Sequence, residues 1–299
     1  MFVIVGIGIV LGGILLGYTL EGGKVAALMQ FKEFIIIGGA GFGSVLIGYG
    51  MKGAISMCTA PLTLLKGNPY TKHNYLELLQ GMYELFLLGR KGGLIALEKH
   101  VEDPTESEVL QKYPFFCHHH HAMSLFADTM KLVVMGGVSV FDLAEMMDMD
   151  IEAQREESLK LSHILATLAD SMPGFGIVAA VLGVVITMAA IGGPPEMIGE
   201  KVGAALVGTF LGVLLAYGVF APQAKAVETI AHAQMQYMGC IKNAIVAFAR
   251  GDAPLICVEF ARRNIEPEVR PGFTEVENAC RNRARADTQP TSHEQAEAA

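Results

Sequence analysis

The sequence predicts an all-α, polytopic membrane protein with four transmembrane helices and a helical cytoplasmic domain. Two observations lead to this prediction: four apolar stretches lack charged residues, and the polar segments around them place apolar residues at helical spacing. The composition agrees, because 52% of the residues are hydrophobic and 17% are charged, whereas soluble proteins have roughly 45–50% and about 25%. The deviation fits membrane spans that alternate with ordinary soluble sequence.

The four apolar stretches are long enough, or nearly long enough, to cross the bilayer. A helical crossing takes about 20 predominantly apolar residues. The stretches are Phe2–Leu20, Phe34–Gly50, Met172–Ile191 and Val202–Ala221. Short loops join the first two and the last two, so we expect two transmembrane hairpins.

The hairpins divide the chain into five predicted regions. Residues 1–50 form the first hairpin, and residues 171–222 form the second. A helical cytoplasmic domain is expected between them at 51–170, and a helical cytoplasmic tail at 223–280. The last segment, 281–299, is poor in apolar residues and is therefore expected to be disordered.

Basic residues predict the orientation of the spans. Cytoplasmic loops of membrane proteins carry the excess of Lys and Arg. Of the 22 basic residues, 19 lie in the large insert or in the tail. The insert, the tail and both termini should therefore be cytoplasmic.

The insert and the tail show helical patterns. One helix is expected at Asn74–His100, because its apolar residues recur at helical spacing while charged residues occupy the other faces. Further patterns cover 123–135, 140–169 and 224–250, and Gly251–Pro254 breaks the last one. The expected core residues of the first helix are Tyr75, Leu78, Leu79, Met82, Leu85 and Phe86.

Small residues on or beside the spans predict close helix packing. Pairs of glycines four residues apart let helix backbones approach each other in lipid. Several such pairs together favour an oligomeric bundle. They are Gly8/Gly12, Gly13/Gly17, Gly39/Gly43, Gly199/Gly203 and Gly208/Gly212.

The predicted spans contain no Asp, Glu, Lys or Arg. Ionisable groups inside a membrane usually mark ion pathways, whereas the hydroxyls of Thr209 and Tyr217 do not change protonation at neutral pH. Either this protein moves no protons, or another chain supplies the acid.

Several functional classes are disfavoured. The net charge of −8 argues against a nucleic-acid partner. The five cysteines form no CxxC pair, so neither a disulfide framework nor a zinc site is indicated. The glycine-rich run at 38–43 lies inside a predicted span and does not indicate a nucleotide site. With no catalytic constellation in a supporting context, we expect no enzyme, no cofactor and no bound metal.

Four consecutive histidines, His118–His121, follow Cys117. Four neighbouring side chains cannot all converge on one metal ion, and on a helix only the first and the last share a face. We interpret the run as a solvated surface segment.

Two long motifs identify a family. Asp170–Val181 reads DSMPGFGIVAAV and Val207–Gly218 reads VGTFLGVLLAYG, with Pro222 after it, on the predicted third and fourth spans. Together with GGAGFGS at 38–44, they make the chain resemble the MotA flagellar stator subunits over essentially its whole length. The resemblance is greatest to the proton-type, enterobacterial-like branch.

The resemblance implies a stator subunit in the bacterial inner membrane. In the family, five copies surround two copies of a single-span MotB subunit, which carries the membrane Asp that binds the proton. Charge changes on that Asp then move the cytoplasmic domain against the rotor protein FliG. The alternative is a TolQ/ExbB-type energising subunit for outer-membrane transport, but those relatives have three spans. A non-energised channel or scaffold is the third hypothesis.

The resemblance also assigns roles to residues. Arg90 and Glu98 match charged rotor-contact positions, and the expected helix at Asn74–His100 would carry them on roughly one side. A solvated helix face is the simpler interpretation of these charges. Pro173 and Pro222 match two prolines that couple ion flow to motion, although Pro173 could simply begin a helix and Pro222 could end one.

Three further residues are expected along the ion path, facing MotB. They are Thr209, Ala180 and Tyr217. Thr209 could equally bond back to its own helix. Ala180 stands where sodium-type relatives tend to carry a hydroxyl, and a methyl group does not replace the hydration of a sodium ion. We therefore expect protons to be the transported ion.

Overall fold

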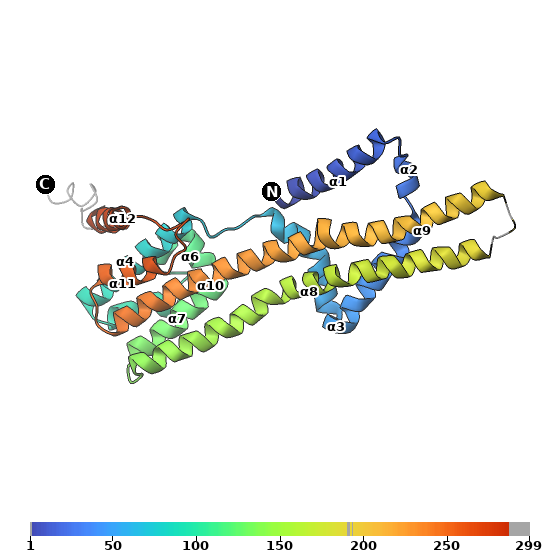
Figure 1. The fold of residues 1–299 in the computed structure, drawn as a ribbon. Helices are drawn as coiled ribbons and strands as arrows, with labels where there is room; N and C mark the ends of the chain where they lie inside the picture. Colours follow the sequence, from blue (N-terminus) through green and yellow to red (C-terminus); the bar gives the residue numbers. More distant parts are fainter. Residues whose placement is uncertain (1, 190–191, 193, 287–299) are drawn as a thin grey trace. The chain divides into compact units, whose positions relative to one another are not determined.

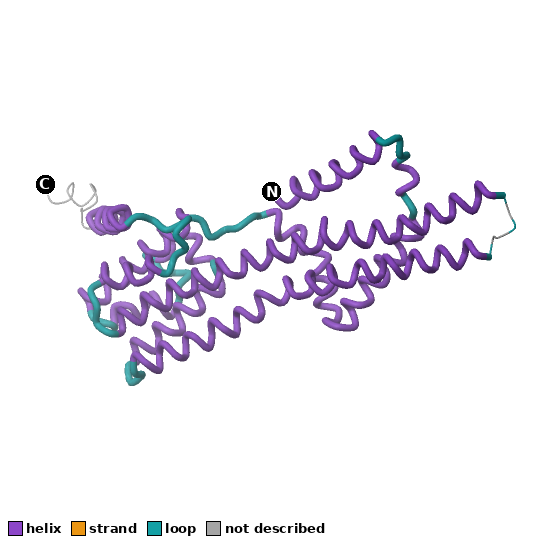
Figure 2. Tube along the Cα trace, viewed as in Figure 1, coloured by secondary structure: helices purple, strands orange, loops and turns teal. Residues whose placement is uncertain are grey.

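The computed structural model describes residues 2–189, 192 and 194–286, and every regular element in these ranges is a helix (Figure 2). Four of the helices are long and apolar enough to cross a membrane. The predicted all-α fold with four spans is confirmed. The chain forms two compact units: a span unit, residues 1–68 and 157–231, and a polar unit, residues 69–156 and 232–299.

The span unit contains both predicted hairpins (Figure 1). Its first hairpin consists of α1, the short α2 and α3, and its second is formed by α8 and α9. Helix α9 passes through one π-helical turn, η2, directly into α10. The bounds are α1 Phe2–Leu20, α2 Val25–Leu28, α3 Phe31–Leu65, α8 Val140–Met188, α9 Pro195–Leu215, η2 Ala216–Phe220 and α10 Ala221–Ala249.

Helix α3 is two helices joined by a bend at Gly50. This residue has φ 66° and ψ −173°, whereas its neighbours are helical. Only glycine adopts such a positive φ without a steric cost. The bend falls at the predicted end of the second span, and the chain then continues helically to Leu65.

The backbones of α8 and α9 touch at three glycines. A Cβ on Gly212 would lie 2.6 Å from the Met172 carbonyl oxygen and 2.8 Å from the Gly176 Cα. A Cβ on Gly176 would lie 2.8 Å from the Gly208 oxygen. The pair Gly208/Gly212 therefore makes the predicted close contact, while the members of the other four pairs have open space where a Cβ would be.

The core of the span unit joins α3, α8 and α9. Helix α1 is the least buried helix of this unit: all of its described side chains are exposed or half-buried. The outer part of α8, residues 177–188, also has many exposed apolar side chains, including Ile177 and Ile186. The principal core residues are Ile37, Val45, Ile164, Leu168, Met172, Val207 and Leu211.

The polar unit is built around α4. All six of the predicted core residues of this helix are buried, with at most 1% of each exposed, so this part of the prediction is confirmed. The unit also takes in the first part of α8 and the last part of α10. Its other elements are α4 Lys72–Gly92, α5 Ile95–Glu102, η1 Leu110–Lys112, α6 Pro114–His118, α7 His120–Met135, α11 Pro254–Arg263 and α12 Phe273–Ala286.

The polar unit differs from the sequence prediction in three respects. The single helix expected at Asn74–His100 is two helices, because α4 ends at Gly92 and Gly93 has φ 78°. Charged residues were expected off the core face, yet Glu77 and Glu84 of α4 are buried. Helix α12 continues to Ala286, six residues into the segment expected to be disordered, and residues 287–299 lie outside the described residues.

Candidate functional sites

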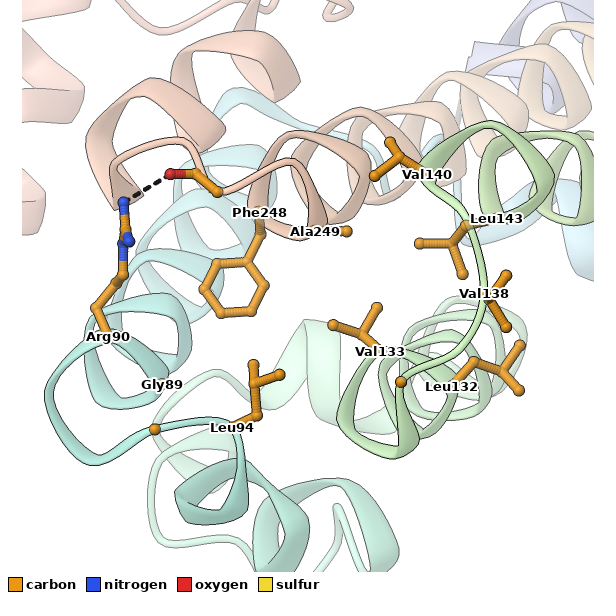
Figure 3. A pocket seen from close by; sticks show the side chains of 13 residues that line it. Gly89, Arg90, Leu94, Leu132, Val133, Val138, Val140, Leu143, Phe248 and Ala249 are labelled. Carbon is orange, nitrogen blue, oxygen red and sulfur yellow. Dashed lines mark hydrogen bonds between the residues drawn. The ribbon is translucent and has the colours of Figure 1, made fainter.

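Three turns meet at one end of the polar unit, and a cavity of about 360 Å³ lies among them (Figure 3). The turns join α4 to α5, α7 to α8 and α10 to α11, and each contains a glycine with positive φ: Gly93, Gly136 and Gly251. Most of the lining is apolar. It includes Leu94, Leu132, Val133, Val138, Leu143 and Phe248.

Arg90 stands at the edge of this cavity. It lies in the last turn of α4, and its Nη2 donates a hydrogen bond to the Gly251 carbonyl oxygen at 2.7 Å (Figure 3). A guanidinium has five N–H donors, and within the described residues this is the one hydrogen bond that Arg90 makes. The contact holds Arg90 on the α10–α11 turn while leaving its charge exposed to solvent.

Glu98 does not share a helix with Arg90, which corrects the expectation from the sequence. Glu98 lies in the first turn of α5, beyond the break at Gly93. Its exposed carboxylate borders a different hollow, with Lys99 and Glu102. Both charges are exposed, but they belong to separate elements and separate hollows.

Exposed apolar side chains accompany these two charges. Ile95 is 80% exposed, Met135 is 72% exposed and Phe141 is 76% exposed, and all three belong to the helices and turns at this end of the polar unit. Soluble proteins rarely gather large exposed apolar residues without a binding role. Together with Arg90 and Glu98, they give this end of the polar unit both exposed apolar and exposed charged side chains.

The α8–α9 contact brings two of the expected ion-path residues together. A Cβ on Gly208 would lie 3.2 Å from the Ala180 nitrogen, and a Cβ on Gly176 would lie 3.3 Å from the Thr209 Cα. Ala180 and Thr209 are both half-buried. Within the described residues the Thr209 hydroxyl makes no hydrogen bond to its own helix, so it remains available to another group.

Tyr217 and Pro222 mark the π-helical turn. Tyr217 lies within η2 and is 67% exposed, whereas Pro222 follows the turn as the second residue of α10. Pro222 does not end a helix, because α10 continues to Ala249. Proline clashes with the carbonyl four residues earlier and cannot bond to it. That carbonyl belongs to Gly218, inside the wider π turn that accommodates the ring.

Pro173 lies inside α8, which runs unbroken from Val140 to Met188. It therefore does not begin the third span, contrary to the simpler interpretation of the sequence. Its ring leaves the Ala169 carbonyl without the usual intrahelical N–H. Near it, the Ser171 hydroxyl bonds back to the Thr167 oxygen at 2.7 Å. Both prolines thus interrupt the hydrogen bonding of continuous helices.

The histidine run is not uniform. His118, His120 and His121 are exposed, as expected, but His119 is half-buried. Its Nδ1 accepts a hydrogen bond from the Ala122 N–H in the first turn of α7, and its Nε2 lies 2.7 Å from the Tyr70 hydroxyl. In the described part of the chain, no group of three or more His, Cys, Asp or Glu side chains is placed to hold a metal ion.

His119 also packs in an aromatic cluster that the sequence does not reveal. The His119 ring stacks on the Tyr237 ring, with 5.7 Å between their centroids. The centroid of the Tyr70 ring lies 5.5 Å from that of Tyr237. Burial lowers the pKa of His119, and the neighbouring His121 and His120 lower it further. The neutral imidazole, which can accept at Nδ1, is the form that this cluster holds.

Glu33 is a buried acid next to the predicted second span, which itself contains no charged residue. The sequence placed it in the loop before the second span, but it lies in the first turn of α3 and is only 7% exposed. Its Oε2 would be 2.8 Å from a Cβ on Gly208, a residue of the fourth span. The spacing of apolar residues could not reveal that Glu33 is buried, because the burial of a residue at a helix end depends on which other helices pack against it.

Two family profiles match the chain. The motility protein A N-terminal family matches residues 4–93, and the MotA/TolQ/ExbB proton channel family matches residues 118–239. Motility protein A of Salmonella typhimurium is 35% identical over 294 residues, which are 98% of this chain and 100% of the relative.

Two solved structures share the fold. The structure of C. jejuni MotAB superposes with a TM-score of 0.73 at 20% identity, covering 89% of this chain and 96% of that one. The flagellar MotAB stator complex from Bacillus subtilis gives a TM-score of 0.67 at 21% identity, covering 86% and 92%.

Proposed function

Because this chain belongs to the motility protein A family, we propose that it is a stator subunit that drives the bacterial flagellar motor. With a MotB-type subunit it forms a proton channel and converts the proton-motive force into torque on the rotor protein FliG. The observation that carries this proposal is the 35% identity to motility protein A across 98% of the chain. The chain is accordingly a multi-pass inner-membrane protein.

The assembly is proposed to contain five copies around two copies of the MotB-type subunit. The exposed apolar surface of α1 and of the outer part of α8 supports contacts with further chains and with lipid. The glycine pairs that face open space, such as Gly199/Gly203, would let other helices approach. Both termini are cytoplasmic in this proposal, as the basic residues indicate.

The transported ion is proposed to be the proton. Its principal carrier is the membrane Asp of the MotB-type subunit, and the path runs beside Ala180, Thr209 and Tyr217. The exposed ring of Tyr217 and the unbonded hydroxyl of Thr209 support this placement. The methyl group of Ala180 offers no oxygen to a dehydrated sodium ion.

The surface with Arg90 and Glu98 is proposed to push the rotor. Exposed ion pairs are worth only about 0–1 kcal/mol, whereas a proton that crosses 100 mV yields about 2.3 kcal/mol. Contacts of this strength can form and break within one ion-driven step. Stronger contacts would hold the rotor in place.

Pro173 and Pro222 are proposed to couple ion flow to movement of the polar unit. Each removes an intrahelical hydrogen bond in a helix that continues from the span unit into the polar unit. A helix weakened at one such point can bend there without unfolding, and the π turn before Pro222 adds a second site of adjustment.

The deciding experiment is complementation of a strain that lacks its own stator subunits. This chain, supplied with a MotB-type partner, should restore swimming to cells that have intact filaments but are paralysed. Swimming should stop with a protonophore and continue without sodium. Cells that stay paralysed although both subunits reach the membrane would contradict the proposal, and rescue of iron uptake instead would favour the TolQ/ExbB-type function.

A further inference from the structure

The side chain of Glu33 is wedged between the two transmembrane hairpins. It begins α3, and it is directed at the α8–α9 contact, where Gly208 leaves room for its carboxyl group. A Cβ on Gly208 would lie 2.8 Å from Oε2, 3.1 Å from the Ala179 Cβ and 3.2 Å from the Ala180 nitrogen. Glycine at 208 is therefore what allows an acid to occupy this position.

The carboxyl group has no partner there. Its Oε2 is buried without a hydrogen bond, and Glu33 forms no ion pair within the described residues. The charged and titratable groups on the elements nearest to it make no bond with it either. They are Tyr18 and Glu21 at the end of α1, Lys24 before α2, Lys32 in α3, Glu196, Glu200 and Lys201 at the start of α9, and Asp170 in α8.

An ionised carboxylate is not stable in this position. Burying a charge without a partner is so costly that the group takes up a proton instead, and membrane surroundings strengthen the effect. The nearest cation along α9, Lys201, precedes Gly208 by seven residues, which is about 10 Å at about 1.5 Å per helical residue. The packing seen here therefore favours the protonated form of Glu33.

We propose that Glu33 is a second proton-binding group of the stator, supplied by this chain and coupled to the packing of α3 on the α8–α9 hairpin. The inference rests on the proposed function, and it adds a titrating group beside the carboxylate of the MotB-type subunit. Protonated Glu33 fits the position against Gly208, where its Oε2 is buried. When its O–H bond breaks and the proton passes to water, the charged oxygen must reach water, so this end of α3 leaves the hairpin.

The position of Glu33 against Gly208 links its protonation to the proposed ion path. Gly208 immediately precedes Thr209, and the Ala180 nitrogen would lie 3.2 Å from a Cβ on Gly208. Movement of Glu33 away from Gly208 therefore changes the packing beside two residues of the proposed path. One proton taken up at Glu33 closes this packing, and one released opens it.

The first test compares Glu33→Gln, Glu33→Asp and the control Glu21→Gln in cells that carry the partner subunit. Gln imitates the protonated acid but cannot release a proton, so swimming and proton conductance should fall about tenfold or more at normal membrane levels. Asp keeps the titration and should retain measurable swimming. Glu21 is exposed in the α1–α2 turn, and its variant should swim normally. Normal swimming of Glu33→Gln would overturn the proposal.

The second test detects the proton itself. Infrared difference spectra of the intact two-subunit complex in vesicles should contain a carbonyl band of a protonated carboxyl group that disappears in Glu33→Gln and persists in Glu21→Gln. Absence of a Glu33-dependent band would overturn the proposal even if swimming is lost. If Glu33→Gln does not accumulate in the membrane, Glu33→Asp replaces it: the carbonyl band should then shift in frequency, and an unshifted band would overturn the proposal. The proposed function is tested separately, by whether the unaltered chain restores motility.

Discussion

Buried carboxylates in the two units of this molecule have opposite surroundings. Glu77 and Glu84 of the polar unit are 9% and 8% exposed, and Glu33 of the span unit is 7% exposed. Glu77 Oε1 accepts hydrogen bonds from the N–H groups of Phe115 at 2.6 Å and Phe116 at 3.4 Å. Glu84 accepts from the Tyr113 hydroxyl at 2.7 Å and from the Lys112 ammonium at 3.3 Å.

The presence or absence of hydrogen-bond donors distinguishes the structural acids Glu77 and Glu84 from Glu33, the proposed proton-binding acid. The polar-unit acids link α4 to the segment around α6, and their oxygens accept hydrogen bonds from donors on that segment. Glu33 faces a glycine backbone and has no donor. Equal burial therefore has unequal meaning: two of the acids are held by hydrogen-bond donors, and the third has a buried oxygen without one.

Glu77→Ala should have the largest effect on stability. It leaves the buried Phe116 N–H and the half-buried Phe115 N–H without an acceptor, and loss of a buried hydrogen bond costs about 1–3 kcal/mol. We expect a clear fall in the thermal melting temperature of the detergent-solubilised chain. Glu33→Ala is the matched variant and should melt no lower than the parent. Equal losses in the two variants would remove the distinction between the acids.

Gly208→Ala should have the next largest effect. The added methyl group would meet the Glu33 carboxyl oxygen at 2.8 Å, and overpacking of this kind costs about 1–3 kcal/mol. Melting should fall and swimming should weaken. Gly203→Ala is the control on the same helix: a Cβ there would meet no atom within 4 Å, so melting should not fall.

The same change in a Glu33→Ala background sharpens the comparison. If the carboxyl group is what the new methyl group displaces, Gly208→Ala should lose most of its effect there. The Ala179 Cβ would lie 3.1 Å from the same methyl group. An undiminished effect in the double variant would assign the crowding to Ala179, and the contact with Glu33 would then carry little weight.

The local parts of this fold were predictable from the sequence, and the contacts between distant segments were not. The core face of α4 follows from helical spacing alone, so Tyr75 and Phe86 could be assigned to it. The break at Gly92-Gly93 had a signal, a glycine pair, which the strong apolar pattern around it concealed. The position of Glu33 against Gly208 joins residues far apart in the chain, and no periodic pattern reports it.

The same limit applies to the candidate sites. In the sequence, nothing distinguishes His119 from the three histidines beside it. Its place between α6 and α7 directs its side chain towards Tyr70 and Tyr237. The prolines were found by their resemblance to family positions, but their place inside continuous helices was missed. Proline usually begins or ends a helix, and the π turn that tolerates Pro222 has no simple signature in the residues.

His119 should give the polar unit a pH dependence of moderate size. Burial lowers its pKa below the ordinary value of 6.5, so the unfolded chain binds the proton more readily than the folded chain. Its contribution to stability is therefore complete above about pH 6.5 and falls as the pH is lowered towards the folded pKa. Protonation at Nδ1 removes the cap on Ala122, which is worth about 1 kcal/mol.

The measurement is the melting temperature between about pH 5 and pH 8 for the parent and two variants. His119→Asn keeps a capping acceptor but does not titrate, so its melting temperature should depend less on pH. His121→Asn removes an exposed histidine and should behave like the parent. If His121→Asn were the variant with the flatter profile, the aromatic cluster around His119 would not be the titrating element.

Arg90→Glu should have the smallest effect on stability and a large effect on movement. The side chain is exposed and makes one hydrogen bond, to Gly251, so its loss should cost about 1 kcal/mol or less. Swimming should nevertheless fall strongly at normal membrane levels, because the reversed charge stands on the proposed rotor surface. Arg155→Glu reverses an exposed charge on α8 that pairs with Glu152, and it should swim normally. If both reversals slow the cells equally, the effect belongs to net charge rather than to this surface. If Arg90→Glu cells swim normally, the end of the polar unit carrying Arg90 does not transmit torque through that residue, and the exposed apolar side chains beside it become the first candidates for the contact.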